Sequence, residues 1–287
     1  MRIDLHTHTT ASDGLLDPAA LVRAAQAAGV GILAVADHDS TDGVDPATAE
    51  GRRVGVEVVP AVELNTDVPG AEVHILGYCL DHHLPWFERL LARLRDGRLH
   101  RAERMVEKLA ALGLPVPMTR VLAFAGGGAV GRPHVARALV EAGYITDTAE
   151  AFTRYIGRNG PAYVERLKVT PAQAVEIIRR AGGVPVLAHP GWLGDDSMVG
   201  DLLAAGLEGI EAYHPDHTPG MVERYLQVAR EHALIVTGGT DFHGGDLATR
   251  VPIGSQHVPP GAVADLRARA ATRRPEPDPP TLDLAAE

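Results

Sequence analysis

The sequence predicts an α/β barrel with a mainly helical insertion. Short apolar segments alternate with segments of helical length along most of the chain, which is typical of parallel strands connected by helices. An open doubly wound sheet would also satisfy this alternation. The barrel is favoured because polar residues follow most of the apolar segments, and barrel enzymes carry their chemistry at the carboxyl ends of the strands. The 287 residues suffice for one large barrel or for two domains.

The first expected element is a short strand. Ile3 and Leu5 alternate with polar neighbours, which is the period of a strand. Asp17 and Pro18 suit the N-cap and the first position of a helix, and Gly29 suits its end. This helix would cover residues 19–28, followed by a strand at 32–36, a helix at 46–53 and strands at 56–62 and 73–78.

A long stretch of helical character then interrupts the alternation. Residues 86–112 carry apolar side chains at helical spacing, and Pro115 and Pro117 follow at the point where the helix should end. A glycine-rich loop and a short helix near 135–142 come next. The chain is therefore divided into a barrel at residues 1–84 and 166–272, a helical insertion at residues 85–165 and a tail at residues 273–287 that is rich in proline and acidic residues and expected to be disordered.

The alternation of strands and helices resumes after the insertion. A helix at 171–180 precedes an apolar segment that begins at Val184, and a strand is expected at 207–213. The remaining elements are a helix at 221–232, a strand at 234–237 and a helix at 263–271, which gives about seven strand–helix units.

Composition and charge limit the classes of partner. The formal net charge of -10 disfavours a general binder of duplex nucleic acid or of anionic membranes. Cys79 is the single cysteine, so no internal disulfide can form and thiolate metal sites are excluded. The sequence shows neither a signal peptide nor an apolar run as long as a membrane span. We therefore expect a cytoplasmic protein, and the sequence leaves its oligomeric state open.

Histidines and carboxylates follow most of the predicted strands. His6 and His8 share a face because side chains two apart on a strand point the same way, and two imidazoles at a strand end suit a metal site. Any one such residue could instead cap a helix or be exposed by chance. Chance does not plausibly explain nine such residues that all follow or lie within predicted strands. The candidate ligands are His6, His8, Asp13, His38, Glu63, His74, His189, Asp241 and His243.

These nine donors exceed what a single ion can use, because a catalytic ion takes three or four protein ligands and keeps a position for water. We therefore expect two or three divalent ions. Mixed imidazole and carboxylate donors suit Mn, Fe or Zn rather than Ca, and Mn is the favoured ion. Glu63 is the expected bridging carboxylate. The histidines away from strand ends are expected to be ordinary surface residues: His82, His83, His100, His232 and His257.

Several of these segments resemble the motifs of the PHP (polymerase and histidinol phosphatase) family and occur in that family's order. The motifs are Asp4-Leu5-His6-Thr7-His8, Asp13-Gly14, Ala36-Asp37-His38-Asp39, Glu63, His74, His189-Pro190 and Asp241-Phe242-His243. The resemblance implies a distorted (β/α)7 barrel with a trinuclear metal site. By the family pattern, the ions would be held by His6, His8, Glu63 and Asp241, by Glu63, His74 and His189, and by Asp13, His38 and His243.

The third of these groups also supplies the expected catalytic residues, Asp13 and His243. Many family members carry histidine at the position of Asp13, so a carboxylate there could change the metal preference. Asp37 and Asp39 are candidates for orienting the histidines, or are simply loop acids. His214 and His217 are candidates for the general acid, although capping a helix explains them equally well.

The insertion is basic inside an acidic protein. Residues 86–137 contain ten Lys or Arg and four Asp or Glu, a balance of +6. Arg98 and Arg101 lie near one helix face, and Arg132 and His134 follow a glycine-rich turn. A solvated basic helix face is the alternative interpretation. Because arginine forms bidentate contacts with phosphate, we expect Arg98, Arg101, Arg132 and His134 to bind a substrate phosphate.

This insertion is also similar to that of a narrower subgroup, the nucleoside 3′,5′-bisphosphate phosphatases, which includes the RNA-trimming enzyme RNase AM. The similarity rests on Arg98, Arg101 and the segment Gly131-Arg132-Pro133-His134. It implies metal-dependent removal of the 3′-phosphate to give a nucleoside 5′-monophosphate and phosphate. Trimming of short 5′-phosphorylated oligonucleotides from the 5′ end is the expected extension.

Three alternatives stay open. The first is another phosphatase of the same family, such as one acting on histidinol phosphate. The second is a metal-dependent amidohydrolase, which is disfavoured because many of these use a carbamylated lysine and neither Lys108 nor Lys168 ends an apolar strand. The third is a module that binds nucleotides or a polymerase without catalysis, against which the full ligand set argues.

Overall fold

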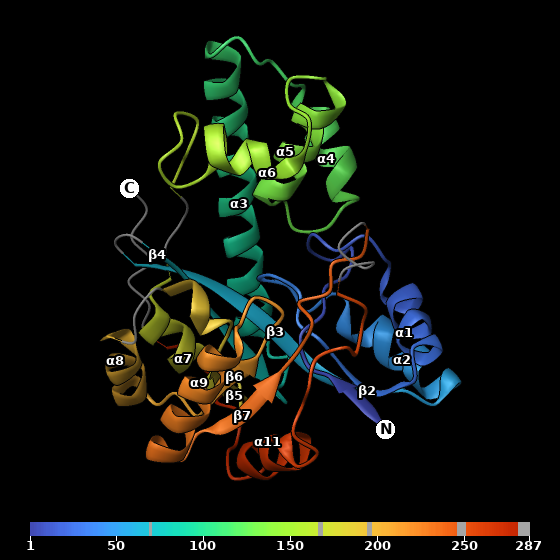
Figure 1. The fold of residues 1–287 in the computed structure, drawn as a ribbon, viewed down its shortest axis with the longest axis vertical. Helices are drawn as coiled ribbons and strands as arrows, with labels where there is room; N and C mark the ends of the chain where they lie inside the picture. The colour runs from blue at the N-terminus through green and yellow to red at the C-terminus, as the bar shows by residue number, and fades with distance from the viewer. Residues whose placement is uncertain (69–70, 166–168, 194–196, 246–250, 281–287) are drawn as a thin grey trace.

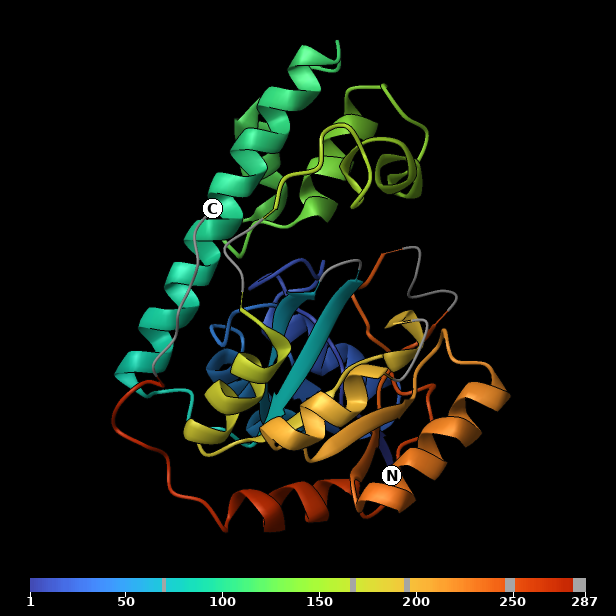
Figure 2. The same ribbon diagram turned by 90° about the vertical axis from the view of Figure 1, so that its left-hand side faces the viewer.

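The computed structural model describes residues 1–68, 71–165, 169–193, 197–245 and 251–280. A barrel forms the lower part of the molecule in Figure 1, and a smaller group of helices stands above it. One long helix runs along the side of the barrel and continues into the upper group, as Figure 2 shows from a second direction. The helical group therefore covers one end of the barrel.

Seven strands follow one another around the sheet in sequence order. The last strand lies beside the first: Leu5 N donates to Gly238 O (3.3 Å), and Thr7 and Phe242 form a parallel bridge just beyond. This confirms the predicted distorted (β/α)7 barrel. The strands are β1 (Arg2–Asp4), β2 (Val30–Val35), β3 (Glu57–Val68), β4 (Ala71–Tyr78), β5 (Val184–Leu187), β6 (Gly209–Tyr213) and β7 (Ile235–Gly238).

Strand β4 runs antiparallel to both of its neighbours, which the expected parallel alternation did not include. Strand β3 extends to Val68 and β4 starts at Ala71, so the connection is far too short for the crossover that a parallel pair requires. The reversal has a consequence for the rim. His74 lies near the start of β4, and there it pairs with Asn65, beyond Glu63 on β3. An early residue of β4 thus reaches the end of the barrel where the parallel strands finish.

Helices cover the outside of the barrel. The predicted cap of the first one is confirmed, because Asp17 Oδ1 accepts from Ala20 N (2.8 Å) and Pro18 is the first helical residue. The helix α8 was not predicted from the sequence. These outer helices are α1 (Pro18–Ala27), α2 (Val44–Val54), α7 (Pro171–Arg180), α8 (Ser197–Ala205) and α9 (Pro219–His232). Helix α11 (Ala262–Ala270) instead lies at the end of the barrel away from the upper group (Figure 2) and packs on the core between the strands.

The upper group of helices has its own small core, which includes Met105, Leu109, Val121, Val135 and Leu139. Its helix α4 was not predicted. None of the described helices combines the length and the apolar composition that crossing a bilayer requires. The group comprises α3 (Pro85–Ala111), α4 (Met118–Ala125), α5 (Arg132–Glu141), α6 (Thr148–Ala151) and a π-helical turn, η1 (Phe152–Ile156).

A close backbone contact fixes the upper group over the rim of the barrel. Ala129 N donates to Ala11 O (3.0 Å) in the loop after β1. A Cβ atom on Gly128 would lie only 2.1 Å from Thr10 O, so this approach requires glycine. The glycine-rich loop of the insertion therefore rests on the same loop that carries Asp13.

Residues 273–280 pack against the barrel, in contrast to the expected disorder of the tail. Glu276 N donates to Arg180 O (2.8 Å), and Glu276 O accepts from Trp86 Nε1 (2.9 Å). Arg273 also pairs with the buried Glu208. Polar contacts hold this segment although it lacks an apolar pattern. Residues 281–287 lie outside the described residues.

Candidate metal centre

The nine predicted donors converge at the rim where β1, β2, β3, β5 and β7 end. In the first cluster, His8 Nε2 lies 3.0 Å from Asp241 Oδ1 and 3.4 Å from Glu63 Oε2. His6 Nε2 lies 3.3 Å from the same Glu63 oxygen and 3.4 Å from Asp241 Oδ1. These four side chains lie close enough together to hold one ion.

A second cluster forms around the other oxygen of Glu63. His74 Nδ1 lies 2.8 Å from Glu63 Oε1, and His189 Nε2 lies 3.1 Å from it. The two imidazole nitrogens are 3.2 Å apart. Asn65 Nδ2 contacts the far nitrogen of His74 at 2.7 Å, which sets the orientation of that ring.

The third cluster gathers around Asp13. His243 Nε2 lies 3.2 Å from Asp13 Oδ1, and His38 Nε2 lies 3.7 Å from Oδ2. His8 also belongs to this group, with its Nδ1 atom 4.0 Å from Asp13. His38 Nδ1 lies 2.9 Å from Glu63 Oε2 and thereby connects this cluster to the others. Glu63 thus contacts donors of all three clusters.

Several buried donor atoms at this rim lack a hydrogen-bond partner among the described residues. They include His6 Nε2, both ring nitrogens of His8, His38 Nδ1 and Glu63 Oε2. A buried polar atom without a partner is costly, so such a group indicates that something else normally contacts it. Neutral imidazoles mixed with carboxylates are the donors that Mn, Fe and Zn prefer. The residues present therefore fit divalent cations.

The pKa shifts of Glu63 and His8 agree with this fit, whereas nearby carboxylates raise the pKa of His6, His38 and His243 although burial opposes it. Burial opposes ionisation of Glu63, but the surrounding histidines, first of all His38 and His74, hold its pKa well below the usual range. Burial, together with the neighbouring His243 and His38, lowers the pKa of His8 to about 3. An ionised carboxylate and a neutral imidazole are the forms that bind a cation.

The backbone is strained at three positions of the rim. Asp39 and Asp241 have φ of 49° and His189 has φ of 24°, a region that residues other than glycine rarely adopt. Such conformations persist only where the surrounding structure holds them, and they cluster at functional sites.

A buried carboxylate that the sequence analysis did not select supports two of the histidines. Glu211 Oε1 lies 3.0 Å from His6 Nδ1, and Oε2 accepts from His189 N (2.8 Å). The sequence did contain a signal for Glu211, because a glutamate in the middle of an apolar strand is seldom buried without a partner. Asp4 has a related role, since its carboxylate accepts from Thr240 N (3.0 Å) and Gly254 N (2.8 Å) and ties β1 to the loops after β7.

The two acids beside His38, Asp37 and Asp39, form hydrogen bonds with other parts of the protein. Asp37 accepts from Thr9 N (2.7 Å), Thr9 Oγ1 (2.7 Å) and Ser12 Oγ (2.6 Å), so it holds the loop that carries Asp13. Asp39 instead accepts from Arg98 Nε (2.7 Å). The first positions a metal-site loop, and the second anchors the insertion to the rim.

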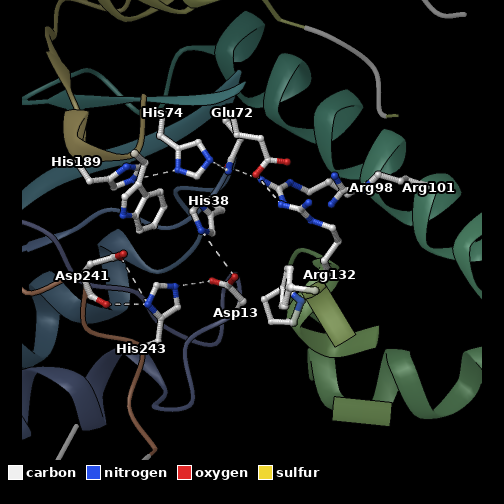
Figure 3. A pocket seen from close by; sticks show the side chains of 14 residues that line it. Asp13, His38, Glu72, His74, Arg98, Arg101, Arg132, His189, Asp241 and His243 are labelled. Atoms are coloured by element: carbon white, nitrogen blue, oxygen red, sulfur yellow. Dashed lines mark hydrogen bonds and ion pairs between the residues drawn. The ribbon is translucent and has the colours of Figure 1, made fainter. Parts of the chain in front are cut away.

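Arginines from the insertion face the clusters across a cavity of about 210 Å³. Figure 3 shows Arg98 and Arg101 reaching in from the long helix and Arg132 from below it, opposite Asp13, His38 and His243. Arg98 is held by Asp39 and Asn65, and Arg132 Nη2 donates to Glu72 Oε2 (2.5 Å). Arginines, two of them paired with carboxylates, thus line one wall of the cavity, and the candidate metal donors line the other.

Not every predicted phosphate contact lies in this cavity. The residues that line the cavity do not include His134, whose Nδ1 accepts from Gly131 N (3.0 Å) at the start of α5. Burial lowers its pKa to about 4, so it is a neutral capping residue. Five lining residues were not predicted as site residues: Asn65, Glu72, Pro133, Phe152 and Trp192. Polar and aromatic residues outside a motif carry no signal that distinguishes them in the sequence.

The two general-acid candidates have different surroundings. His217 Nε2 accepts from Gly191 N (3.1 Å) and its Nδ1 faces Ala212 O (2.9 Å), so the backbone occupies both ring nitrogens. His214 Nε2 lies 3.6 Å from Asp241 Oδ2 and remains near the rim. Lys108 donates to Tyr163 O (2.7 Å) in the insertion, and Lys168 lies outside the described residues. No described lysine therefore bridges the clusters.

The chain is similar in sequence to a known protein family and to several characterised bacterial enzymes. Residues 4–93 match the family model of the PHP domain. The 5′-3′ exoribonuclease Rnm of Escherichia coli (strain K12) is 36% identical over 249 residues, which cover 84% of each chain. The 3′,5′-nucleoside bisphosphate phosphatase of Chromobacterium violaceum is 32% identical over 264 residues, or 90% of this chain and 93% of the relative.

A solved structure from Bifidobacterium adolescentis, assigned to the metal-dependent phosphoesterases, superposes with a TM-score of 0.86. It is 32% identical in sequence, and the superposition covers 93% of this chain and 96% of the other. The similarity thus includes the insertion as well as the barrel.

Proposed function

Because the chain belongs to the PHP-domain family of metal-dependent phosphoesterases, we propose that it removes the 3′-phosphate from nucleoside 3′,5′-bisphosphates. The products would be a nucleoside 5′-monophosphate and inorganic phosphate. One observation carries the proposal: three partly buried clusters of candidate metal donors and three arginines face each other across a single cavity. A substrate with two phosphates can place one on each wall. The relative from Chromobacterium violaceum, which is named for this reaction, supports the same choice.

The proposed ligands are the nine rim residues. His6, His8, Glu63 and Asp241 would hold one ion, Glu63, His74 and His189 a second, and Asp13, His38 and His243 a third. Mn is the proposed metal, with Fe or Zn as alternatives. Divalent cations, when bound, polarise the phosphoryl oxygens and lower the pKa of a coordinated water. Glu211, Asn65 and Asp37 would keep the ligands in position through the contacts described above.

The arginines would hold the 5′-phosphate. Arg98 and Arg101 are nearly buried in α3, and Arg132 lies beside them at the start of α5. Asp39 and Glu72 orient two of the guanidinium groups, so little side-chain entropy is lost when the phosphate binds. In the reaction, a bond forms between the water oxygen and phosphorus, the P–O3′ bond breaks, and O3′ takes up a proton.

Release of inorganic phosphate in Mn buffer tests the proposal. The substrates would be a nucleoside 3′,5′-bisphosphate, the matching 3′-monophosphate and histidinol phosphate. We expect the bisphosphate to be hydrolysed with the highest kcat/KM. Chelation with EDTA should abolish turnover, and added Mn should restore it, because the proposed reaction depends on divalent cations to polarise the phosphoryl oxygens. Preference for histidinol phosphate, or turnover that survives chelation, would contradict the proposal.

Arg132→Ala tests the phosphate-binding wall. Loss of one charged hydrogen bond, about 1.5–3 kcal/mol, should lower kcat/KM for the bisphosphate roughly 10- to 100-fold, mainly through KM. The 3′-monophosphate lacks the group that Arg132 would contact, so its kcat/KM should change little. Arg104→Ala on the exposed face of α3 is the matched control. Equal losses for both substrates would show that the arginine does not bind the 5′-phosphate.

A further inference from the structure

A second group of metal donors lies outside the rim of the barrel. Asp45, His82 and His83 each offer one donor atom, and the three atoms lie within 4.8 Å of one another. None of these residues belongs to a rim cluster. They line a separate cavity of about 330 Å³, between the loop that leads from β2 into α2 and the first turns of α3.

The spacing of the donor atoms suits a small divalent cation. His82 Nε2 lies 3.0 Å from Asp45 Oδ1, and His83 Nε2 lies 3.7 Å from the same oxygen. Two ligands of a tetrahedral Zn lie roughly 3.3 Å apart, because each Zn–N or Zn–O bond is about 2.0–2.2 Å long. The observed separations fall on either side of that value, so an ion fits among the three atoms after small rotations of the side chains.

The two imidazoles reach the same oxygen although they are neighbours in the chain. In an extended segment, neighbouring side chains would point to opposite sides. Here a turn brings the rings together, with 4.0 Å between their centroids. Asp81 Oδ1 accepts from His83 N (3.1 Å) within this turn, and Asp81 N donates to Ala181 O (2.8 Å). The backbone therefore holds both donors before an ion binds, which lowers the entropy lost on binding.

An ordinary surface ion pair explains this group less well. One protonated histidine is enough to neutralise Asp45, and a second protonated ring so close would be repelled by the first. Two neutral imidazoles can instead ligate one cation together, with the carboxylate as the third ligand. The hydrogen bond with His82 lowers the pKa of Asp45, so this carboxylate is in the ionised form that a metal requires.

We propose that Asp45, His82 and His83 bind one Zn²⁺ ion and leave its fourth tetrahedral position to water. Imidazole mixed with a carboxylate favours Zn over Mg and Ca, which prefer oxygen ligands. The ion would connect two segments that are 37 positions apart in the chain. One is the start of α2, which follows the loop after the rim residue His38, and the other is the turn that leads into α3.

An ion at this place would strengthen the attachment of the insertion to the barrel. Arg95 of α3 lines the same cavity, and its guanidinium group lies 3.5 Å from Asp39 O and 3.7 Å from Asp42 Oδ2. The ion would thus join the two segments that Arg95 already connects. Because its three ligands meet only in the folded chain, Zn should raise the melting temperature.

Equilibrium dialysis against Zn²⁺, followed by measurement of the Zn bound per chain, tests the proposal. His83→Ala and Asp45→Asn should each weaken the binding of one ion at least roughly 10- to 100-fold, because loss of a ligand should cost no less than loss of a contact that supports one. Both side chains are largely exposed, so the variants should fold. The rise in melting temperature with added Zn should be smaller in both.

His100→Ala is the matched control. His100 Nδ1 lies 3.3 Å from Glu103 Oε2 on the surface of α3, but this pair belongs to no group of three donors among the described residues. A single histidine and carboxylate should not hold the ion, so this variant should bind as much Zn as the wild-type protein.

Glu63→Gln separates this ion from those at the rim. His83→Ala should remove one Zn per chain from a Glu63→Gln background just as it does from the wild-type protein, because the two sites share no ligand. The assignment is overturned if either His83→Ala or Asp45→Asn binds Zn with the wild-type content and affinity. It is also overturned if His83→Ala has no effect in the Glu63→Gln background.

Discussion

We expect the substitution Glu63→Gln to lower kcat by a factor on the order of 10³. Glu63 Oε1 faces His74 and His189, whereas Oε2 faces His6, His8 and His38. The amide keeps the shape of the side chain but replaces one anionic oxygen with a donor that cannot ligate a cation. Two clusters would lose the carboxylate that they share, and His38 of the third would lose its contact with Glu63, so the effect should exceed that of any change in the cavity wall.

The measurement is single-turnover phosphate release, together with metal content determined after dialysis. Metal bound per chain should fall along with kcat. Glu57→Gln, at an exposed position of the same strand, is the matched control and should retain both activity and metal. If the Glu63→Gln protein keeps near-normal turnover and metal content, Glu63 is not the shared ligand of these clusters.

His243→Ala and Asp13→Ala are expected to lower kcat by roughly 10² -fold or more while the fold is retained. His243 Nε2 lies 3.2 Å from Asp13 Oδ1. Neither residue belongs to the cluster of His6, His8, Glu63 and Asp241. Each substitution should therefore remove one ion and leave the others. Because both variants break the same cluster, the double variant should be scarcely worse than either single one.

Far-ultraviolet circular dichroism and the melting temperature would verify that these variants fold. His100→Ala on α3, where the imidazole is largely exposed, is the control for loss of a histidine. Turnover that is unchanged in either single variant would exclude the third ion from catalysis. Additive losses in the double variant would indicate that Asp13 and His243 act separately.

The convergence of the nine candidate donors at one rim could be predicted because their signal is local. A histidine or carboxylate at the end of an apolar strand is visible in the sequence, and the geometry of a barrel then brings strand ends together. His74 is the instructive case. It lies near the start of its strand rather than at the end, and only the reversal of β4 carries it to the same rim as Glu63.

The supporting residues could not be predicted in the same way. Whether Arg98 binds a substrate or an acid of the rim depends on the distance between the insertion and Asp39, which are far apart in the sequence. His134 lies in the same sequence motif as Arg132, yet its Nδ1 atom accepts a hydrogen bond from the backbone N–H of Gly131 in its own turn.

The sequence by itself determined the barrel, the rim of donors and the basic character of the insertion, because strand periodicity, residue type and charge are properties of short segments. The tertiary structure decided which donors share an ion-sized cluster and which arginines face the candidate metal centre. Those features depend on contacts between residues far apart in the chain, and such contacts are set by packing, which no local pattern encodes.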